Sequence, residues 1–227
     1  GDRVKWQAQS EGGYTIEEVE ERTRALSRLK PLSSGRGSRR WDRQGYLRER
    51  EQVIIANPDQ VVFVVACANP EPRLKKLDRL LDGAERQGIP SLICANKVDL
   101  VALDEAKRMF RVYERIGYAV LYTSAKTGAG VAELRDALKG KISALIGPSG
   151  VGKSSLLNTM EPGLGQRIME VSSATGKGRH TTTVSEMVPL GVGGWVADTP
   201  GIRALALFDL DPEEIDAYFP DIVPYVP

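Results

Sequence analysis

The sequence predicts an α/β fold: a mostly parallel β-sheet with helices on both faces, preceded by a small β segment. Two observations support this prediction. From residue 53 onwards, short continuous apolar runs alternate with stretches of helical spacing, as in strands that are buried on both faces and joined by crossover helices. Before residue 22, apolar and polar residues alternate singly, which is typical of strands with one exposed face.

The N-terminal segment is predicted to form a β-hairpin. Residues 3–9 and 14–21 have the alternating pattern and flank a Ser-Glu-Gly-Gly turn. Two or three strands are too few for an independently stable domain. We therefore expect residues 1–51 to be part of a small β domain whose first strands are absent, followed by a basic linker. The candidate inward-facing residues of the hairpin are Val4, Trp6, Tyr14, Ile16 and Val19.

Charge is unevenly distributed along the chain, although 31 Lys and Arg nearly balance 30 Asp and Glu. Residues 22–50 contain ten basic and two acidic residues, a net charge of +8, whereas residues 202–227 contain six acidic residues and one arginine, a net charge of −5. Arginines interleaved with an aromatic residue suit contact with the phosphates and bases of nucleic acid. A solvated linker has the same composition, so charge alone leaves both interpretations open.

Residues 52–208 are expected to form the core domain. The predicted strands are residues 53–57, 61–66, 91–95, 118–122 and 142–146, and the predicted helices are residues 73–88, 104–117, 131–140 and a fourth that begins at residue 152. Residues 183–190 and 193–198 are predicted to form a second hairpin. Residues 209–227 are interpreted as the start of a C-terminal extension with a short acidic helix.

A glycine-rich sequence, Gly-Pro-Ser-Gly-Val-Gly-Lys-Ser, lies between the predicted strand 142–146 and the helix that follows it. It matches the P-loop pattern in the strand–loop–helix context that the pattern requires. Backbone N–H groups of such a loop, with the helix N-terminus behind them, bind phosphate oxygens. Lys153 would add positive charge at the β- and γ-phosphates, and the Ser154 hydroxyl is a suitable Mg²⁺ ligand. The predicted nucleotide contacts are Gly147, Ser149, Gly150, Val151, Gly152, Lys153, Ser154 and Ser155.

Two further segments, each directly after a predicted strand, indicate which base is bound. In Asn-Lys-Val-Asp, the Asp99 carboxylate can accept both N–H groups on the N1/N2 edge of guanine, a pair that adenine lacks. Asn96 can contact the base or tie neighbouring loops together, and the Lys97 stem can cover the base plane. In Ser-Ala-Lys-Thr-Gly, backbone N–H groups can donate to guanine O6. The predicted contacts of that segment are Ser124, Ala125 and Lys126.

The sequence Asp-Thr-Pro-Gly follows the last predicted strand and is suited to sensing the γ-phosphate. Asp198 can hold Mg²⁺ through water, and the Gly201 N–H can reach the γ-phosphate. Between the P-loop and this segment lies a run of three threonines, one of which can complete the Mg²⁺ shell; Thr182 is favoured. The P-loop and the two base-binding segments each follow a strand at its carboxyl end, where open α/β folds bind ligands. The sequence therefore predicts a site for GTP or GDP with Mg²⁺.

These segments occur in a permuted order, because the two base-binding segments precede the P-loop. That order, the string GPSGVGKSS, the His-Thr-Thr-Thr run and the preceding β segment resemble the family of ribosome small-subunit-dependent GTPase A (RsgA). The resemblance covers most of the chain. It implies a circularly permuted P-loop GTPase domain preceded by a partial OB-fold. Family members carry a C-terminal zinc domain, but this sequence stops before any Cys/His cluster, so no zinc ligand is expected here.

The resemblance also implies a function and a set of partners. Family members hydrolyse GTP when stimulated by the small (30S) ribosomal subunit and act in its late maturation. The expected partners are therefore this subunit and its rRNA, and the protein is expected to be a cytoplasmic monomer. The resemblance also points to the single histidine, His180, as a catalytic residue.

The catalytic water needs a partner other than the usual glutamine. Ile202 occupies the position where many GTPases place that glutamine, and an isoleucine cannot orient water. His180 lies beside the threonine run, and an imidazole can orient or deprotonate water near neutral pH. We therefore predict His180 and Lys153 as the catalytic residues.

Two other functions fit parts of the sequence. The P-loop also resembles that of guanylate kinases, which would make the chain a nucleoside monophosphate kinase, but that interpretation leaves the other segments unexplained. Basic residues 22–50 are also compatible with an RNA-binding assembly module whose nucleotide site is structural. Cys67 and Cys94 lie in apolar runs and are expected to be buried and reduced, as in a cytosolic protein. No apolar run is long enough to span a bilayer, so no membrane partner is expected.

Overall fold

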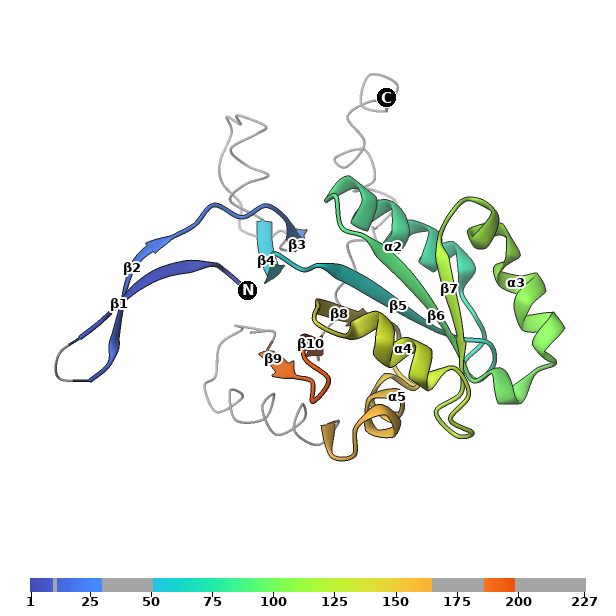
Figure 1. Ribbon diagram of the computed structural model, residues 1–227. Coiled ribbons are helices and arrows are strands. Elements are labelled where there is room, and N and C mark those ends of the chain that lie inside the picture. Colours follow the sequence, from blue (N-terminus) through green and yellow to red (C-terminus); the bar gives the residue numbers. More distant parts are fainter. Residues whose placement is uncertain (10–11, 30–50, 165–185, 199–227) are drawn as a thin grey trace, which may run out of the picture.

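The structure, a computed structural model, describes residues 1–9, 12–29, 51–164 and 186–198. Its centre is a six-stranded sheet with the strand order β7-β6-β5-β8-β10-β9 (Figure 1). These strands are β5 (Gln60–Ala66), β6 (Ser91–Asn96), β7 (Ala119–Thr123), β8 (Ile142–Ile146), β9 (Glu186–Pro189) and β10 (Trp195–Asp198). Neighbouring strands are parallel except β9, which pairs antiparallel with β10. The predicted parallel sheet and second hairpin are confirmed.

Helices cover both faces of this sheet (Figure 1). One face carries α2 (Leu74–Arg86) and α3 (Leu103–Arg115), and the other carries α4 (Val131–Leu138) and α5 (Lys153–Met160). Alternate side chains of β5 divide between the layers: Val61 and Phe63 pack with α2 and α3, whereas Val62 and Val64 pack with α4 and α5. Burial on both faces explains the continuous apolar sequence of β5. No helix in the described ranges is long and apolar enough to cross a membrane.

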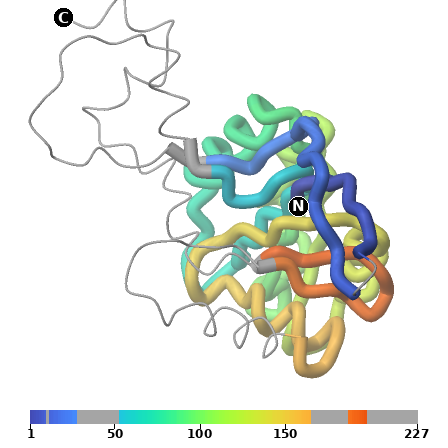
Figure 2. The backbone as a smooth tube through the Cα atoms, turned by 90° about the vertical axis from the view of Figure 1, so that its left-hand side faces the viewer, coloured from blue at the N-terminus to red at the C-terminus, as the bar shows by residue number. Residues whose placement is uncertain are grey.

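The first strand predicted for the parallel sheet lies elsewhere. β4 (Glu51–Ala56) pairs antiparallel with β3 (Ala25–Leu29), and the two strands run side by side (Figure 2). Only residues 57–59 separate β4 from β5. Two consecutive strands can be parallel neighbours only across a crossover of a dozen or more residues. The prediction that residues 53–57 form a strand is confirmed, but its placement in the parallel sheet is wrong.

The N-terminal hairpin is present, but its apolar face is not buried. β1 (Val4–Ala8) pairs antiparallel with β2 (Tyr14–Val19), and the hairpin extends away from the sheet (Figure 1). The Trp6 and Tyr14 rings pack edge to face, with centroids 4.6 Å apart. The five residues predicted to face inward are exposed, because no described element covers them. Their exposed fractions are 36% for Val4, 57% for Trp6, 73% for Tyr14, 60% for Ile16 and 58% for Val19.

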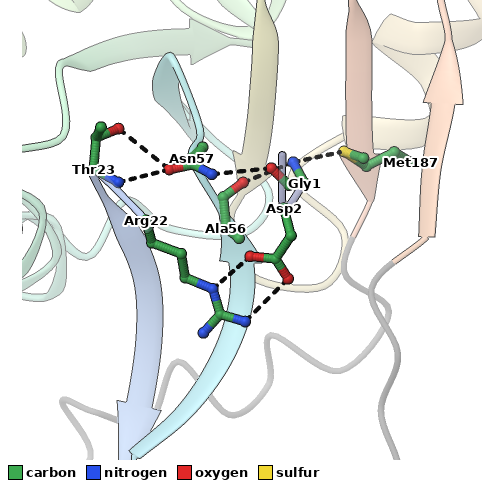
Figure 3. Close-up of polar contacts among 7 residues, drawn as sticks. All are labelled: Gly1, Asp2, Arg22, Thr23, Ala56, Asn57 and Met187. Atoms are coloured by element: carbon green, nitrogen blue, oxygen red, sulfur yellow. Dashed lines mark hydrogen bonds and ion pairs between the residues drawn. The ribbon is translucent and has the colours of Figure 1, made fainter. Parts of the chain in front are cut away.

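The N-terminal strands are held to the sheet through the turn between β4 and β5 (Figure 3). The Asn57 side chain accepts a hydrogen bond from the Thr23 backbone N–H at 2.9 Å and donates to the Gly1 carbonyl at 3.1 Å. The Gly1 nitrogen donates to the Ala56 carbonyl at 2.7 Å. One amide side chain therefore connects three separate stretches of the chain.

Candidate nucleotide-binding site

The three segments predicted to bind nucleotide follow three parallel strands, β7, β6 and β8, at the same edge of one sheet, with β5 between β6 and β8. The P-loop follows β8, residues 96–99 begin at the end of β6, and residues 124–128 follow β7. Carboxyl ends of parallel strands share one edge, which is where open α/β folds bind ligands. The topology therefore brings together segments that are far apart in the sequence.

Glycine is required in the P-loop because other chain atoms approach its backbone closely. A Cβ at Gly147 would lie 2.3 Å from the Val64 carbonyl oxygen. Gly152 has a φ of 97°, and a Cβ there would lie 2.4 Å from the Asn96 side-chain nitrogen. Gly152 also precedes the first residue of α5, so the loop leads directly into a helix N-terminus. This is the strand–loop–helix geometry that suits phosphate oxygens.

The Lys153 ammonium is held against the backbone of its own loop. Its Nζ donates to the Gly147 carbonyl at 2.6 Å and to the Pro148 carbonyl at 3.2 Å. Ser154 and Ser155 are both exposed in the first turn of α5, whereas the leucines that follow them are buried. The loop thus presents one cation and two hydroxyl groups beside a helix N-terminus, a set that suits a phosphate chain and a hard cation.

Asn96 ties the base-binding segment of β6 to the P-loop. This buried side chain donates to the Val151 carbonyl at 2.8 Å, and its oxygen accepts a hydrogen bond from Thr123 Oγ1 at 3.2 Å. Of the two roles considered for Asn96, its contacts in this structure are those of a tie between loops. Sequence reasoning missed Thr123, which lies at the end of β7 outside any motif.

Lys97 connects the P-loop to the loop after β5. Its backbone is left-handed, with a φ of 65°. Its Nζ donates to the Gly150 carbonyl at 2.6 Å and also to the Asn69 carbonyl. Asn69 belongs to no motif, and a backbone acceptor leaves no signal in a sequence, so this contact could not have been predicted.

Asp99 and Ser124 join the two base-binding segments to each other. Ser124 Oγ donates to Asp99 Oδ1 at 2.6 Å and accepts a hydrogen bond from the Thr127 N–H at 3.2 Å. Asp99 lies in the short 3₁₀ helix η1 (Val98–Leu100) and is exposed, so its carboxylate is accessible to a ligand. From α5, Thr159 Oγ1 donates to the Ala125 carbonyl at 3.0 Å. Lys126 is exposed beside them.

Comparison with known proteins identifies this arrangement. The model of the RsgA GTPase family matches residues 40–208. The chain belongs to the RsgA GTPase family. The small ribosomal subunit biogenesis GTPase RsgA of Gemmatimonas aurantiaca is 40% identical over 226 residues, which are 99% of this chain and 69% of that protein. Its counterpart in Moorella thermoacetica is 48% identical over 170 residues, 75% of this chain and 58% of that protein.

Solved structures agree with this RsgA assignment. YjeQ from Thermotoga maritima is similar with a TM-score of 0.66 and 34% identity, covering 97% of this chain and 67% of that chain. YloQ, described as a circularly permuted GTPase, gives a TM-score of 0.59 and 29% identity, covering 99% of this chain and 64% of that chain. The predicted circularly permuted GTPase fold is therefore confirmed, and the chain spans about two thirds of these relatives.

Several residues predicted to act in the RsgA site fall outside the part of the chain that the structure describes. His180, Thr182 and Gly201 lie outside the described residues, as does the short acidic helix expected in residues 209–227. Asp198 ends β10, where its backbone pairs with Leu145 of β8, the strand that leads into the P-loop. This register brings Asp198 to the sheet edge from which the P-loop starts.

The metal chemistry of the RsgA site can be judged from the donors present. Among the described residues, no group of three or more His, Cys, Asp or Glu side chains could hold a metal ion. Mg²⁺ does not need such a group, because it keeps several waters and takes few protein ligands besides phosphates. Zn²⁺ does need one, so these residues do not fit zinc. Cys67 and Cys94 are free and buried, as predicted, and burial raises the pKa of Cys94 to about 12.

A pocket of about 220 Å³ adjoins the P-loop on the side of α2. Residues 147–149 form part of its wall, together with the charged side chains of Glu71, Arg73 and Lys76 and apolar residues of β5, β8 and α2. Neither base-binding segment lines it. This pocket is therefore distinct from the site at which Asp99 and Ser124 meet.

Proposed function

We propose that the protein binds and hydrolyses GTP and acts in the biogenesis of the small ribosomal subunit. The observation that carries this proposal is the hydrogen-bonded connection of the P-loop, Asn96, Asp99 and Ser124 at one sheet edge. A kinase with the same P-loop would not need the two base-binding segments. The relatives that match this chain are named small ribosomal subunit biogenesis GTPases.

The phosphates would be held by the loop from Gly147 to Ser155, with Lys153 neutralising their charge. Mg²⁺ would be held by Ser154 and Thr182, and by Asp198 through water; when bound, it neutralises the charge that builds on the phosphate oxygens during transfer. Gly201 would report the γ-phosphate through its N–H group. These roles are supported by the position of Ser154 in the first turn of α5 and by the register of β10 beside β8.

Guanine would be recognised by Asp99, with Lys97 and Lys126 flanking the base and the N–H groups of Ser124 and Ala125 near its O6 atom. The hydrogen bond from Ser124 fixes one oxygen of the Asp99 carboxylate. A carboxylate orientated in this way accepts the two guanine donors together. Adenine would leave it unpaired, which disfavours ATP by as much as about 10⁴-fold.

The small subunit and its rRNA would be the macromolecular partners. The basic stretch 22–50, with a net charge of +8, supports contact with RNA. We assign residues 1–51 to a partial OB-fold with this linker, residues 52–208 to the GTPase domain and residues 209–227 to a C-terminal extension. The protein would act as a monomer.

Phosphate release by the purified protein, with and without small ribosomal subunits, tests this proposal. We expect slow hydrolysis of GTP that rises when subunits are added, and no transfer of phosphate from ATP to GMP. Asp99→Asn is the control that assigns turnover to this site, because it should weaken GTP binding and reduce the preference over ATP. A protein that hydrolyses no GTP in either condition would refute the proposal.

His180→Ala tests the source of catalysis. We expect GTP affinity to be kept and subunit-stimulated turnover to fall by about 10²-fold or more, which is the usual contribution of general base catalysis. Equilibrium titration with a fluorescent GTP analogue and single-turnover hydrolysis separate the two effects. Unchanged stimulated turnover would exclude His180 as the group that acts on water.

A further inference from the structure

Half of the acidic side chains of α2 and α3 accept hydrogen bonds from tyrosine hydroxyls of α3, of β7 or of the residue just before β7. Tyr113 of α3 donates its hydroxyl to Asp78 of α2 at 2.6 Å. Tyr118 donates to Glu85 of α2, and Tyr122 of β7 donates to Glu114 of α3 at 3.1 Å. Three of the six acidic residues in these two helices therefore bind tyrosine hydroxyls instead of neighbouring cations.

The cations of α3 lie on its outer side. At 3.6 residues per turn, Arg108, Arg111 and Arg115 fall within an arc of about 60°, opposite the buried Ala106 and Phe110. All three arginines are exposed, and no ion pair or hydrogen bond of theirs occurs among the described residues. Asp104, in the first turn, is the acidic residue on the same side.

A neighbouring cation extends this patch. Lys107 lies at its edge on α3 and is exposed as well. Figure 1 shows α3 with α2 on one face of the sheet. We call these four exposed cations, Lys107, Arg108, Arg111 and Arg115, the α3 basic face.

This arrangement is unfavourable for an isolated helix. Lys107 and Arg111, and Arg111 and Arg115, are four residues apart, and like charges at that spacing destabilise a helix. Asp104 and Glu114 offset part of this repulsion, because the hydrogen bond from the neutral Tyr122 hydroxyl leaves the Glu114 carboxylate charged. A polyanion bound to the outer face would remove the remaining repulsion.

We propose that the α3 basic face binds the phosphate backbone of RNA in the small ribosomal subunit. Three of its four cations are arginines, whose planar guanidinium groups bind phosphate in a bidentate manner. A membrane surface fits less well, because a membrane-bound helix needs a broad free apolar face, and the apolar face of α3 is buried against the sheet. The inference rests on the proposed function for its partner, and it adds a second contact surface besides the basic stretch 22–50.

The test compares two double variants that each lose two positive charges, one variant on each face of the sheet. Arg108→Gln with Arg111→Gln alters the basic face, and Arg135→Gln with Lys139→Gln is the matched control on the side of α4; all four residues are exposed. Binding to purified small ribosomal subunits and to protein-free small-subunit rRNA is measured between about 50 and 200 mM salt, the range in which phosphate contacts are resolved.

We expect the Arg108/Arg111 variant to bind both probes more weakly. The slope of log affinity against log salt should fall by about 0.7 to 0.9 for each phosphate that the variant no longer neutralises. GTP hydrolysis without subunits should stay unchanged, because neither residue touches the nucleotide site. Equal binding by the two double variants would overturn the inference. Weaker binding to subunits with unchanged binding to bare rRNA would also overturn it and indicate an acidic protein partner.

These outcomes separate the inference from the function on which it rests. If the unaltered protein hydrolyses GTP but the Arg108/Arg111 variant binds RNA normally, the basic face fails and the proposed function stands. If the unaltered protein hydrolyses no GTP, the proposed function fails whatever the variants do. Equal melting temperatures of the two variants would show that the comparison is not distorted by unfolding.

Discussion

Gly152 is needed at the candidate site both for its backbone conformation and for its lack of a side chain. Its left-handed backbone leads the P-loop into α5, and the space that a side chain would take is occupied by the Asn96 amide. Asn96 in turn holds the Val151 carbonyl. The identity of one P-loop residue therefore determines whether a base-binding segment can keep its position.

Alanine substitutions at two left-handed glycines test this dependence. Gly163 has a φ of 82° and no atom within 4 Å of an added Cβ, so Gly163→Ala introduces backbone strain alone. Gly152→Ala introduces similar strain and also displaces Asn96. We expect only Gly152→Ala to weaken GTP binding, by about 5- to 150-fold, the equivalent of one disrupted buried hydrogen bond at about 1–3 kcal/mol. Equal affinities of the two variants in a fluorescence titration would contradict this role.

The motifs predicted which residues lie together at the sheet edge better than they predicted the contacts of these residues. Asn96, Asp99 and Ser124 could be found because side chains in fixed sequence patterns carry the signal. Lys97, by contrast, bonds to backbone oxygens of Gly150 and Asn69, and Thr159 bonds to that of Ala125. Any residue supplies a carbonyl oxygen, so nothing in the sequence distinguishes these acceptors.

At the scale of elements, apolar runs predicted strands reliably but not their partners. β4 and β5 are both apolar, yet they belong to different sheets, because the short connection between them forbids parallel pairing. β3 was missed because Ala25–Leu29 contains an arginine and a serine and lies within a basic stretch. A strand at the margin of a small sheet keeps the polar residues that a central strand excludes.

Three tyrosine–carboxylate bonds link α2, α3 and β7, and they predict an alkaline limit of stability. Burial is the larger cause and the hydrogen bond to Glu85 the second, and together they raise the pKa of Tyr118 to about 12. The pKa values of Tyr113 and Tyr122 are also raised, again by burial first and by the bonded carboxylate second. Above a pH of about 10, the unfolded chain releases these protons while the folded chain keeps them. The free energy of unfolding therefore falls as the pH rises further.

Urea denaturation at a series of pH values measures this fall. Tyr118→Phe removes one of the three hydroxyl protons whose release is coupled to unfolding. We therefore expect a smaller loss of stability between about pH 10 and 12 than in the unaltered protein. Measurements at pH 8 provide the reference, since there the hydroxyl is protonated in both states. An identical dependence on pH in the two proteins would show that Tyr118 is not linked to folding.

At the scale of the whole molecule, the apolar face of the β1–β2 hairpin is separate from the core of the GTPase domain. Trp6 and Ile16 are 57% and 60% exposed, whereas Phe110 is fully buried between α3 and the sheet. The alternating sequence correctly predicted a hairpin with one apolar face. It could not show what covers that face, because alternation records the side on which apolar residues lie and not their partner.

Substitutions in the hairpin and in the core test whether the apolar face of the hairpin contributes to the free energy of unfolding. Trp6→Thr with Ile16→Thr should change the free energy of unfolding by no more than about 0.5 kcal/mol, as is usual for surface positions. Phe110→Ala should lower it by about 3–5 kcal/mol, because it leaves a cavity in the core. Chemical denaturation followed by circular dichroism compares them. A large loss in the hairpin variant would show that this face is packed in solution.

The order of strands along the chain has a consequence for how the protein is made. Residues 60–123 contain β5, β6 and β7 with their two helices, and their pairings join neighbours such as Val61 with Ser91 and Leu92 with Ala119. The P-loop strand pairs with the other edge of β5, where Val61 meets Ala144. Because domains form from the N-terminal side during translation, the half that carries the two proposed base-binding segments can fold while the P-loop is still being synthesised. The permutation thus reverses the order in which the two halves of the nucleotide site emerge.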